Sequence, residues 1–248
     1  MNLFTTYYAT DPQRQQELAE SLASNIQNTL IESIHVFLDP NTSESILEQF
    51  KQQPGFDKVS YLRSVGKPSY REWLDHSRTR LGRGISIFAN ADISFDETLA
   101  KLGDYVALPR SIVCLTRHED VRGTPKLHKT PRWSQDVWAM RSENIADITF
   151  LEQLSFETGQ PRCDNRCAFV FAIHGWNIFN PCVDVRAIHK HQYNTRSYSK
   201  GSPVNIGGMG MVWPSHSPRS PSKVDIEVFC LDSQNITGCR LNKFLEPQ

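Results

Sequence analysis

The start of the chain reads as a strand, a helix and a second strand in close succession. Residues Leu3–Tyr8 are aromatic and β-branched, which is typical of a strand. From Arg14 to Gln27, leucine and isoleucine recur every four residues among polar side chains, which predicts an amphipathic helix. The apolar run Ile34–Leu38 predicts a second strand, and it stops at Asp39. Because a strand–helix–strand unit of this kind pairs its strands in parallel, the sequence predicts an α/β, Rossmann-like fold whose ligand site lies at the carboxyl ends of the strands.

The same alternation continues along the chain. We expect helices over Ser43–Gln52, Ser69–Leu81 and Cys167–His174, and strands over Val59–Leu62, Gly84–Ala89, Tyr105–Thr116, Trp176–Pro181 and, last of all, Val224–Leu231. Residues Arg117–Arg132 show no periodicity and predict a long surface loop, and Gly207–Met211 predict a flexible apolar stretch. With 248 residues there is room for one substantial core. We therefore predict a mostly parallel sheet flanked by helices in a single domain, with 1–200 as its body and 201–248 as a tail of the same domain.

The composition excludes several classes of protein. The formal net charge is +0, so bulk electrostatics gives no nucleic-acid signature. No apolar run reaches the length of a membrane span, and the first residues lack the features of a signal peptide, so we expect a cytoplasmic protein. The six cysteines show no paired C-x-x-C spacing; Cys163 and Cys167 could begin a metal knuckle, but no second pair completes it, and we expect buried thiols.

The predicted strand Gly84–Ala89 runs directly into Asn90 and Asp92. Both residues offer oxygen ligands, and in an extended segment they would lie on one side. Hard divalent cations prefer oxygen ligands, and nucleotide diphosphates bind such cations, so the pair is a candidate metal–diphosphate site. The alternative is a turn that leads to a helix cap at Asp96.

Two further segments carry candidate groups. Asp136 lies between Trp133 and Trp138, next to Gln135, a mixture suited to holding a sugar by stacking and hydrogen bonding. Asp164 lies at or near the start of the predicted helix that ends at Gly175. Asp136 could instead be an ordinary ion-pair partner, and Asp164 an ordinary helix N-cap.

A histidine pair follows later in the chain. His189 and His191 would share one face of a strand and could both reach an ion or a phosphate. Lys190 and Arg196 are basic residues beside them that could contact phosphate. The alternative is a set of solvated or structural histidines.

In this order, the motifs resemble the GT-A type glycosyltransferases, and are similar to their large inverting branch. The strings N-x-D-I-x-F-D, Q-D-x-W, C-D-N-R and H-x-H resemble an uncharacterised bacterial group of glycosyltransferases. The resemblance extends from Leu3 to about Tyr198 and depends more on the order of the motifs than on any one of them. It implies a GT-A like fold, a nucleotide-sugar donor and a Mn²⁺ or Mg²⁺ cofactor.

The resemblance also implies roles for individual residues. The donor-binding residues would be Thr5, Tyr7, Asp39, Asn90, Asp92, Arg166, Lys190 and Arg196. The metal ligands would be Asp92, Asn90, His189 and His191. Asp164 would be the catalytic base, with Asp136 as the second choice, and Trp133, Gln135 and Trp138 would bind the acceptor, with 201–248 as an acceptor-side or lid segment. Asn90 departs from the usual first carboxylate, which removes one charge and leaves open an enzyme that neutralises the diphosphate with Lys190 or Arg196.

The sequence thus predicts a metal-assisted glycosyltransferase that uses a UDP- or GDP-sugar and an acceptor of unknown class. Two alternatives remain. One is a silent nucleotide-sugar or glycan-binding module, and the other is a metal-dependent phosphoesterase or nucleotidyltransferase, for which carboxylates at strand ends and an H-x-H pair would also serve.

Overall fold

The structure is a computed structural model, and it describes residues 1–80, 84–121, 123–190, 207–232 and 235–241. His191 and Arg196 lie outside the described residues.

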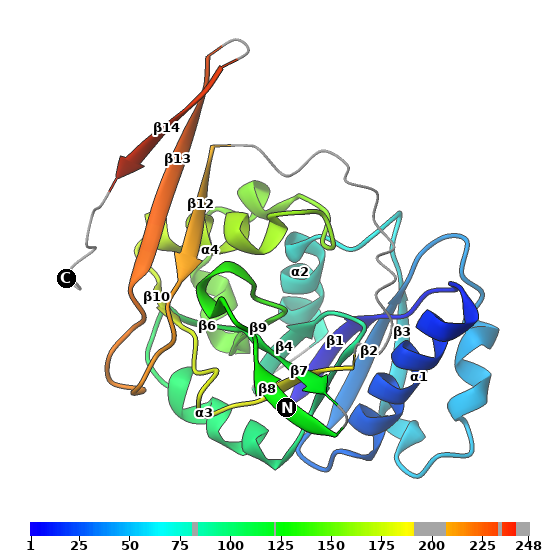
Figure 1. Cartoon of the computed structure of the whole chain (residues 1–248). Coiled ribbons are helices and arrows are strands. Elements are labelled where there is room, and N and C mark those ends of the chain that lie inside the picture. The colour runs from blue at the N-terminus through cyan, green and yellow to red at the C-terminus, as the bar shows by residue number, and fades with distance from the viewer. Residues whose placement is uncertain (81–83, 122, 191–206, 233–234, 242–248) are drawn as a thin grey trace.

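A seven-stranded sheet forms the centre of the molecule, in the order β10-β6-β9-β4-β1-β2-β3 (Figure 1). Its strands are β1 Asn2–Thr6, β2 Ser33–Leu38, β3 Val59–Arg63, β4 Ile85–Ala89, β6 Ser111–Leu115, β9 Val137–Arg141 and β10 Asn177–Phe179. Neighbouring strands pair in parallel except for β9, which is antiparallel to both β4 and β6. The prediction of a mostly parallel α/β sheet in a single domain is confirmed.

Helices cover both faces of this sheet. The α-helices are α1 Pro12–Gln27, α2 Tyr70–Arg80, α3 Leu102–Tyr105 and α4 Cys163–Ile173. Short 3₁₀ helices are η1 Glu44–Phe50, η2 Phe56–Lys58, η3 Glu97–Lys101, η4 Pro131–Trp133, η5 Ser142–Asp147 and η6 Leu151–Leu154. The helix expected over Ser43–Gln52 is therefore the 3₁₀ helix η1.

Two apolar cores lie on opposite faces of the sheet. Leu3 packs with the apolar face of α1 in one core, and its neighbour Phe4 packs with Trp73 of α2 and Phe171 of α4 in the other. Successive side chains of a strand point to opposite faces, so β1 contributes to both cores. This is why the strands read as continuous apolar runs and why β1 and β2 were predictable.

Two smaller sheets flank the central one. The first has the order β5-β11-β7-β8, with β5 Ile93–Phe95, β7 Arg117–Val121, β8 Thr124–Leu127 and β11 Ala187–His189. The second has the order β12-β13-β14, with β12 Gly208–Val212, β13 Val224–Asp232 and β14 Asn235–Leu241, and β13 and β14 extend beyond the body of the protein (Figure 1).

Four local predictions are wrong. The segment expected to be a long loop forms the hairpin β7–β8, and Glu119 of β7 pairs with His189 of the neighbouring strand β11. Residue Tyr105 ends α3, so the strand expected from this residue begins only at Ser111. The glycine-rich Gly207–Met211 is mostly strand β12, buried against α4. Finally, β13 is followed by another strand, β14.

Close packing explains the glycines of β12. A Cβ atom at Gly208 would lie 2.4 Å from the ring of Phe169, and one at Gly210 would lie 2.9 Å from the main-chain nitrogen of the same residue. Only glycine allows the strand to approach α4 this closely. Asn165 of α4 fixes the contact by donating a hydrogen bond to the carbonyl of Gly210 (3.2 Å).

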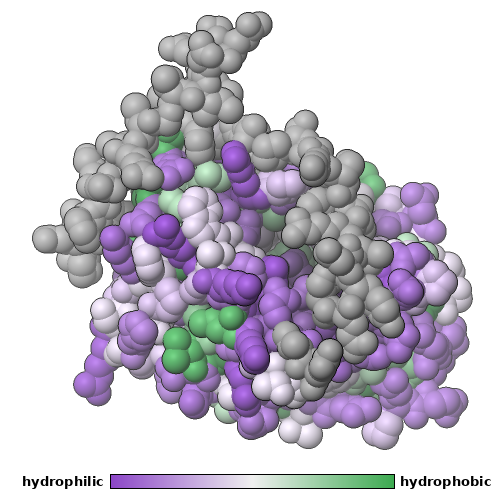
Figure 2. Space-filling model, viewed as in Figure 1, coloured by the Kyte–Doolittle hydropathy of each residue, from purple (hydrophilic) through white to green (hydrophobic). Residues whose placement is uncertain are grey.

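Four cysteines, Cys114, Cys163, Cys167 and Cys182, are buried and free, as expected. Among the described residues, no helix is long and apolar enough to cross a bilayer. The coloured part of the face shown in Figure 2 is mostly hydrophilic, with apolar side chains in small groups.

Candidate active site

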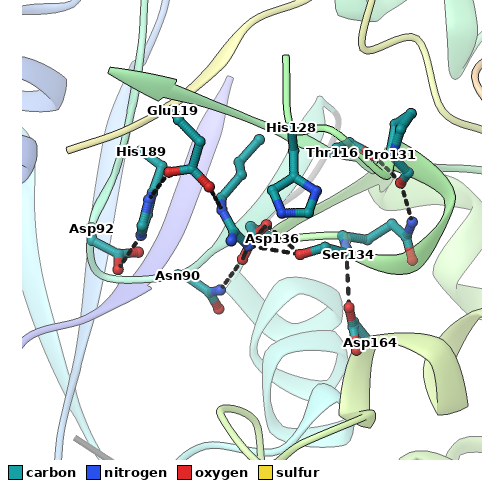
Figure 3. Close-up of polar contacts among 12 residues, drawn as sticks. Asn90, Asp92, Thr116, Glu119, His128, Pro131, Ser134, Asp136, Asp164 and His189 are labelled. Atoms are coloured by element: carbon teal, nitrogen blue, oxygen red, sulfur yellow. Dashed lines mark hydrogen bonds and ion pairs between the residues drawn. The ribbon is translucent and has the colours of Figure 1, made fainter. Parts of the chain in front are cut away.

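The polar residues at the end of β4 point in two different directions. Asn90 turns towards the start of β9: its main-chain N–H donates to the carbonyl of Asp136 (3.0 Å) and its side-chain amide to Asp136 Oδ1 (2.8 Å). Asp92 follows two residues later, and its Oδ2 atom lies 2.9 Å from His189 Nε2 (Figure 3). The two residues expected to share one ligand therefore contact different partners, because a turn between them breaks the strand alternation.

Asp92 has a second partner in α1. The guanidinium of Arg14 donates a hydrogen bond to the same Oδ2 atom and forms an ion pair with Glu17 (2.8 Å). Burial alone would raise the pKa of Asp92, but the positive charges of His189 and Arg14 outweigh it and hold that pKa well below its usual range. Asp92 is thus a buried carboxylate, and its charge is matched by two cations.

His189, at the end of β11, lies between two carboxylates. Its Nδ1 atom is 2.9 Å from Oε2 of Glu119, a residue of β7. Burial alone would lower the pKa of His189, yet the attraction of Asp92 and the hydrogen bonds to Asp92 and Glu119 raise it to about 9. The hydrogen bond with His189, together with Arg117, lowers the pKa of Glu119 to about 2. The imidazole is therefore doubly protonated at neutral pH and donates to both carboxylates.

Arg117 connects this group to Asp136. Its Nε donates to Glu119 Oε1 (2.7 Å), and its Nη1 lies 3.1 Å from Asp136 Oδ2. A continuous polar chain thus extends from Arg14 of α1 through β11, β7 and the start of β9 to the end of β4. Figure 3 shows its part from Asp92 to Asn90. Asp136 thus forms an ion pair with Arg117, which was the alternative role that the sequence left open for it. Arg117 and Glu119 were missed because their segment lacks a strand pattern, and no local signal indicates contact with His189, seventy residues away.

Asp164 lies in the first turn of α4 on the other side of Asp136. Its Oδ2 atom accepts a hydrogen bond from the main-chain N–H of Gln135 (3.0 Å). Burial raises its pKa to about 6, despite this hydrogen bond. Arg162, not Asp164, is the N-cap residue, so the expected position near the helix start is confirmed and the N-cap alternative is wrong. A half-buried carboxyl with a pKa near neutrality is suited to proton transfer.

The three expected acceptor-binding residues lie in different environments. Trp133 is 41% exposed at the surface. Trp138 is only 2% exposed and packs edge-on against Tyr70, with ring centroids 5.6 Å apart. Its burial in a strand of the central sheet does not favour the predicted contact with an acceptor. The side chain of Gln135 is buried too and donates to the carbonyl of Pro131 (3.1 Å), so only its main chain lies at the site.

The expected donor-binding residues also differ in accessibility. The side chains of Thr5 and Tyr7 are buried, and the Gln49 amide donates to the Tyr7 hydroxyl (3.1 Å), so their burial does not favour the predicted contact with the donor. Asp39 is half-buried after β2 and accepts a hydrogen bond from the N–H of Asn41 (2.8 Å). Lys190 is half-buried, and its main-chain N–H donates to the Asp92 carbonyl (3.2 Å).

Arg166 is buried on α4, with its guanidinium carbon 5.1 Å from the centre of the Phe169 ring. Burial lowers its pKa, and no described residue accepts a hydrogen bond from its Nη1 atom.

The side chains fit a divalent cation in part. Asp92 Oδ2 and His189 Nε2 face each other, and Glu119 orients the imidazole from its other nitrogen, as carboxylates do behind histidine ligands. Asn90 turns away, so its predicted role as a ligand is not supported by the geometry. Among the residues that the structure describes, no group of three or more histidine, cysteine or acidic side chains could hold a metal ion. A cation here would take two protein ligands, in competition with Arg14, and further ligands from its substrate.

Comparison with solved structures decides the fold. A mannosyltransferase from Pyrobaculum calidifontis, PcManGT, in complex with GDP-Man and Mn²⁺, is similar with a TM-score of 0.53 and 14% identity, over 79% of this chain and 58% of that chain. S. aureus TarS 1–349 in complex with UDP-GlcNAc is similar with a TM-score of 0.52 and 11% identity, over 80% of this chain and 62% of that chain. GalNAc-T7 with UDP, GalNAc and Mn²⁺ is similar with a TM-score of 0.53 and 10% identity, over 83% of this chain and 45% of that chain. This chain has a GT-A fold.

The GT-A fold agrees with the resemblance that the motifs indicated. This chain spans between 45% and 62% of the three chains, so parts of those proteins have no counterpart here. No family model matches the sequence, and no curated protein matches it either. At such low identity the similarity establishes the GT-A fold alone, and the activity has to be argued from the site.

Proposed function

We propose that this chain is a glycosyltransferase that moves a hexosyl or pentosyl unit from a UDP- or GDP-sugar to a hydroxyl group of an acceptor. The observation that supports this most is the position of Asp164, a carboxyl whose pKa is raised to about 6 by burial. It lies two hydrogen-bonding steps from the end of β4, through Gln135 and the adjacent Asp136. In parallel α/β sheets, ligands bind at this carboxyl edge.

In the proposed reaction Asp164 is the base. The acceptor hydroxyl gives its proton to the Asp164 carboxylate while its oxygen forms a bond to the anomeric carbon. The bond between that carbon and the diphosphate oxygen breaks, and the electron pair leaves with the diphosphate. Asp136 is the less suitable base because Asn90 and Arg117 already hold its two carboxylate oxygens.

Cations near Asp92 would stabilise the leaving diphosphate. Arg14 and Lys190 lie beside this residue, from α1 and from the end of β11 respectively. A divalent cation held by Asp92 and His189 would supply further positive charge for the diphosphate. His189 would first have to lose its Nε2 proton, because a metal ligand must offer a lone pair. Asp39 would contact the nucleotide base, and Arg166 and Asn90 would remain candidates for donor contacts, as would Arg196.

One experiment tests the proposal. The purified chain is incubated with UDP-, GDP-, CMP- and dTDP-sugars, with and without Mn²⁺, and nucleotide release and thermal shift are recorded. We expect at least one donor to stabilise the protein and to be turned over, and Asp164→Asn to bind the same donor without turnover. Asp57→Asn, an exposed aspartate far along the sheet, is the matched control. If no nucleotide-sugar shifts the melting temperature under any metal condition, the proposed function is wrong.

A silent nucleotide-sugar-binding module is the second candidate. The ion pair of Arg14 with Asp92 favours it, because Arg14 occupies an oxygen that a catalytic cation would need. In that case a donor would bind equally well with or without Mn²⁺, no turnover would be seen, and Asp164→Asn would not change binding.

A further inference from the structure

A cavity lies between η4 and the strands β12 and β13, and none of its lining residues belongs to the polar chain. Its volume is about 260 Å³, and its walls include Arg132 and Trp133 from η4, Met211 from β12, and Lys223 and Asp225 at the start of β13. Pockets for small molecules usually measure roughly 300 to 1,000 Å³. This cavity is therefore suited to a single sugar-sized ring rather than to a whole nucleotide-sugar.

One exposed tryptophan, Trp133, lines this cavity, and a second, Trp213, lies beside it in contact with the lining residues Arg132 and Asp225. Trp133 is 41% exposed and Trp213, directly after β12, is 37% exposed. The guanidinium of Arg132 lies between them, 4.5 Å from the centre of the Trp213 ring and 5.7 Å from that of Trp133. Exposed apolar surface rimmed by polar residues is typical of ligand-binding sites. Aromatic rings of this kind pack against the C–H faces of sugars while polar neighbours bind the hydroxyls.

The charges around the tryptophans are balanced. Asp225 accepts a hydrogen bond from the indole N–H of Trp213 (2.8 Å) and lies 3.4 Å from Lys223 Nζ and 3.7 Å from Arg132 Nη1. Glu227 adds a second carboxylate to the lining, so two acids match two bases. A strongly anionic ligand would find no excess of positive charge here. A neutral polyhydroxylated ligand would find both donors and acceptors.

One short segment links this cavity to the candidate base. Trp133 ends η4, and Gln135, two residues later, donates its main-chain N–H to Asp164 (3.0 Å). The Pro131 carbonyl at the start of η4 accepts from both the Thr116 hydroxyl (2.6 Å) and the Gln135 amide (3.1 Å), which fixes the segment against the end of β6 (Figure 3). A ligand seated on Trp133 thus rests on the segment whose other end orients Asp164.

We propose that this cavity binds a neutral sugar unit of the acceptor, with Trp133 as its aromatic wall and Trp213 beside it, so that the acceptor is a saccharide. This inference rests on the proposed function, because it names the acceptor class of the same reaction. An acidic glycan would require an excess of basic residues in the lining.

Binding of neutral oligosaccharides tests the proposal. The probes are di- and trisaccharides of glucose, galactose, mannose and N-acetylglucosamine, and matched oligosaccharides with a uronic acid, observed by saturation-transfer NMR and by tryptophan fluorescence. We expect at least one neutral probe to bind with a Kd of about 1 mM. Trp213→Ala and Trp133→Ala should each weaken it by about three- to tenfold. Trp213→Phe, which keeps an aromatic ring, should weaken it less, and Tyr61→Ala, an exposed aromatic on β3, should have no effect.

The outcomes separate this proposal from the proposed function. If a nucleotide-sugar binds but no neutral saccharide does, or if only the acidic probes bind, the saccharide proposal is overturned and the transferase proposal stands. If a saccharide binds through Trp213 but no nucleotide-sugar binds, the proposed function fails and the cavity is a glycan-binding site. If a neutral probe binds unchanged in both tryptophan variants, it binds elsewhere and the proposal is overturned. Circular dichroism of each variant shows whether it is folded.

Discussion

The main-chain N–H of Gln135 donates a hydrogen bond to Asp164 Oδ2 across 3.0 Å, and this bond joins the segment just before β9 to the first turn of α4. An N–H donor stabilises the charged carboxylate, whereas burial destabilises it. The effect of burial is the larger of the two, and it raises the pKa of Asp164 to about 6. The side chain can therefore take up and release a proton near physiological pH.

Transferase activity should depend on the ionisation of Asp164. Because the base must be unprotonated, turnover should be constant above about pH 7 and should fall about tenfold per pH unit below pH 6. Asp164→Asn should reduce turnover by roughly 10²- to 10⁴-fold, the usual contribution of a general base. A pH–rate profile of the wild type with a saturating donor is the measurement. A profile with no inflection between pH 5 and pH 7 would contradict the assignment.

The same pKa predicts how stability changes with pH. The pKa of Asp164 is higher in the folded state than in the unfolded state. Between these two pKa values the folded chain therefore binds more protons than the unfolded chain. The free energy of unfolding consequently rises as the pH falls through about 6. Asp164→Asn removes the buried charge, so we expect the variant to be as stable as the wild type or more stable at pH 8, with the difference shrinking below pH 6. Urea unfolding at pH 8 and below pH 6 measures the difference in stability between the variant and the wild type. The control Asp57→Asn changes an exposed residue, and its stability difference should not depend on pH. A variant that is less stable at pH 8 would refute the prediction.

The sequence predicted the central sheet better than the site. Leu3 and Phe4 belong to an uninterrupted apolar run, and such runs identify strands that are buried on both faces. The antiparallel β9 was not predicted, because its apolar run is short and begins directly after the polar residues Ser134–Asp136. That misplacement made the core residue Trp138 look like a ligand contact.

The ion pairs of the site were not predictable, since each depends on distant segments. Asp92 contacts Arg14 from α1 and His189 from β11, and neither spacing leaves a local pattern. The residue types were informative about the chemistry, but only the folded chain shows which of them meet.

Arg14 should compete with a metal ion for Asp92. Arg14→Ala removes one of the two groups that contact the Asp92 Oδ2 atom, so we expect the variant to bind Mn²⁺ several-fold more tightly in the presence of a nucleoside diphosphate. It should also lose about 1–3 kcal/mol of stability, because a buried carboxylate loses a partner. Isothermal titration with MnCl₂ and urea unfolding measure the two effects. Asp92→Asn should abolish the metal effect, and equal Mn²⁺ affinity in Arg14→Ala and the wild type would argue against competition.

Close approach of β12 to α4 should make Gly210 intolerant of a side chain. Gly210→Ala places a Cβ atom 2.9 Å from the main-chain nitrogen of Phe169, and a backbone atom inside a helix cannot move aside easily. We expect a loss of about 1–3 kcal/mol, as in other overpacked cores.

Gly103 in α3 is the matched control for this substitution. Its added Cβ would meet only the side-chain tip of Ile85, at 3.9 Å. Gly103→Ala should therefore be neutral or stabilise the protein by about 0.5–1 kcal/mol through helix propensity.

The two tryptophans on either side of Asp136 should respond in opposite ways to substitution. Trp138 is 2% exposed and packs among Tyr70 and its neighbours, so Trp138→Ala should lower the free energy of unfolding by about 3–5 kcal/mol. Trp133 is 41% exposed, so Trp133→Ala should change it by less than about 0.5 kcal/mol while weakening saccharide binding. Urea unfolding of both variants makes the comparison. A stable Trp138→Ala protein with impaired acceptor binding would restore the role that the sequence pattern indicated for Trp138 and would place the acceptor on the other side of β9.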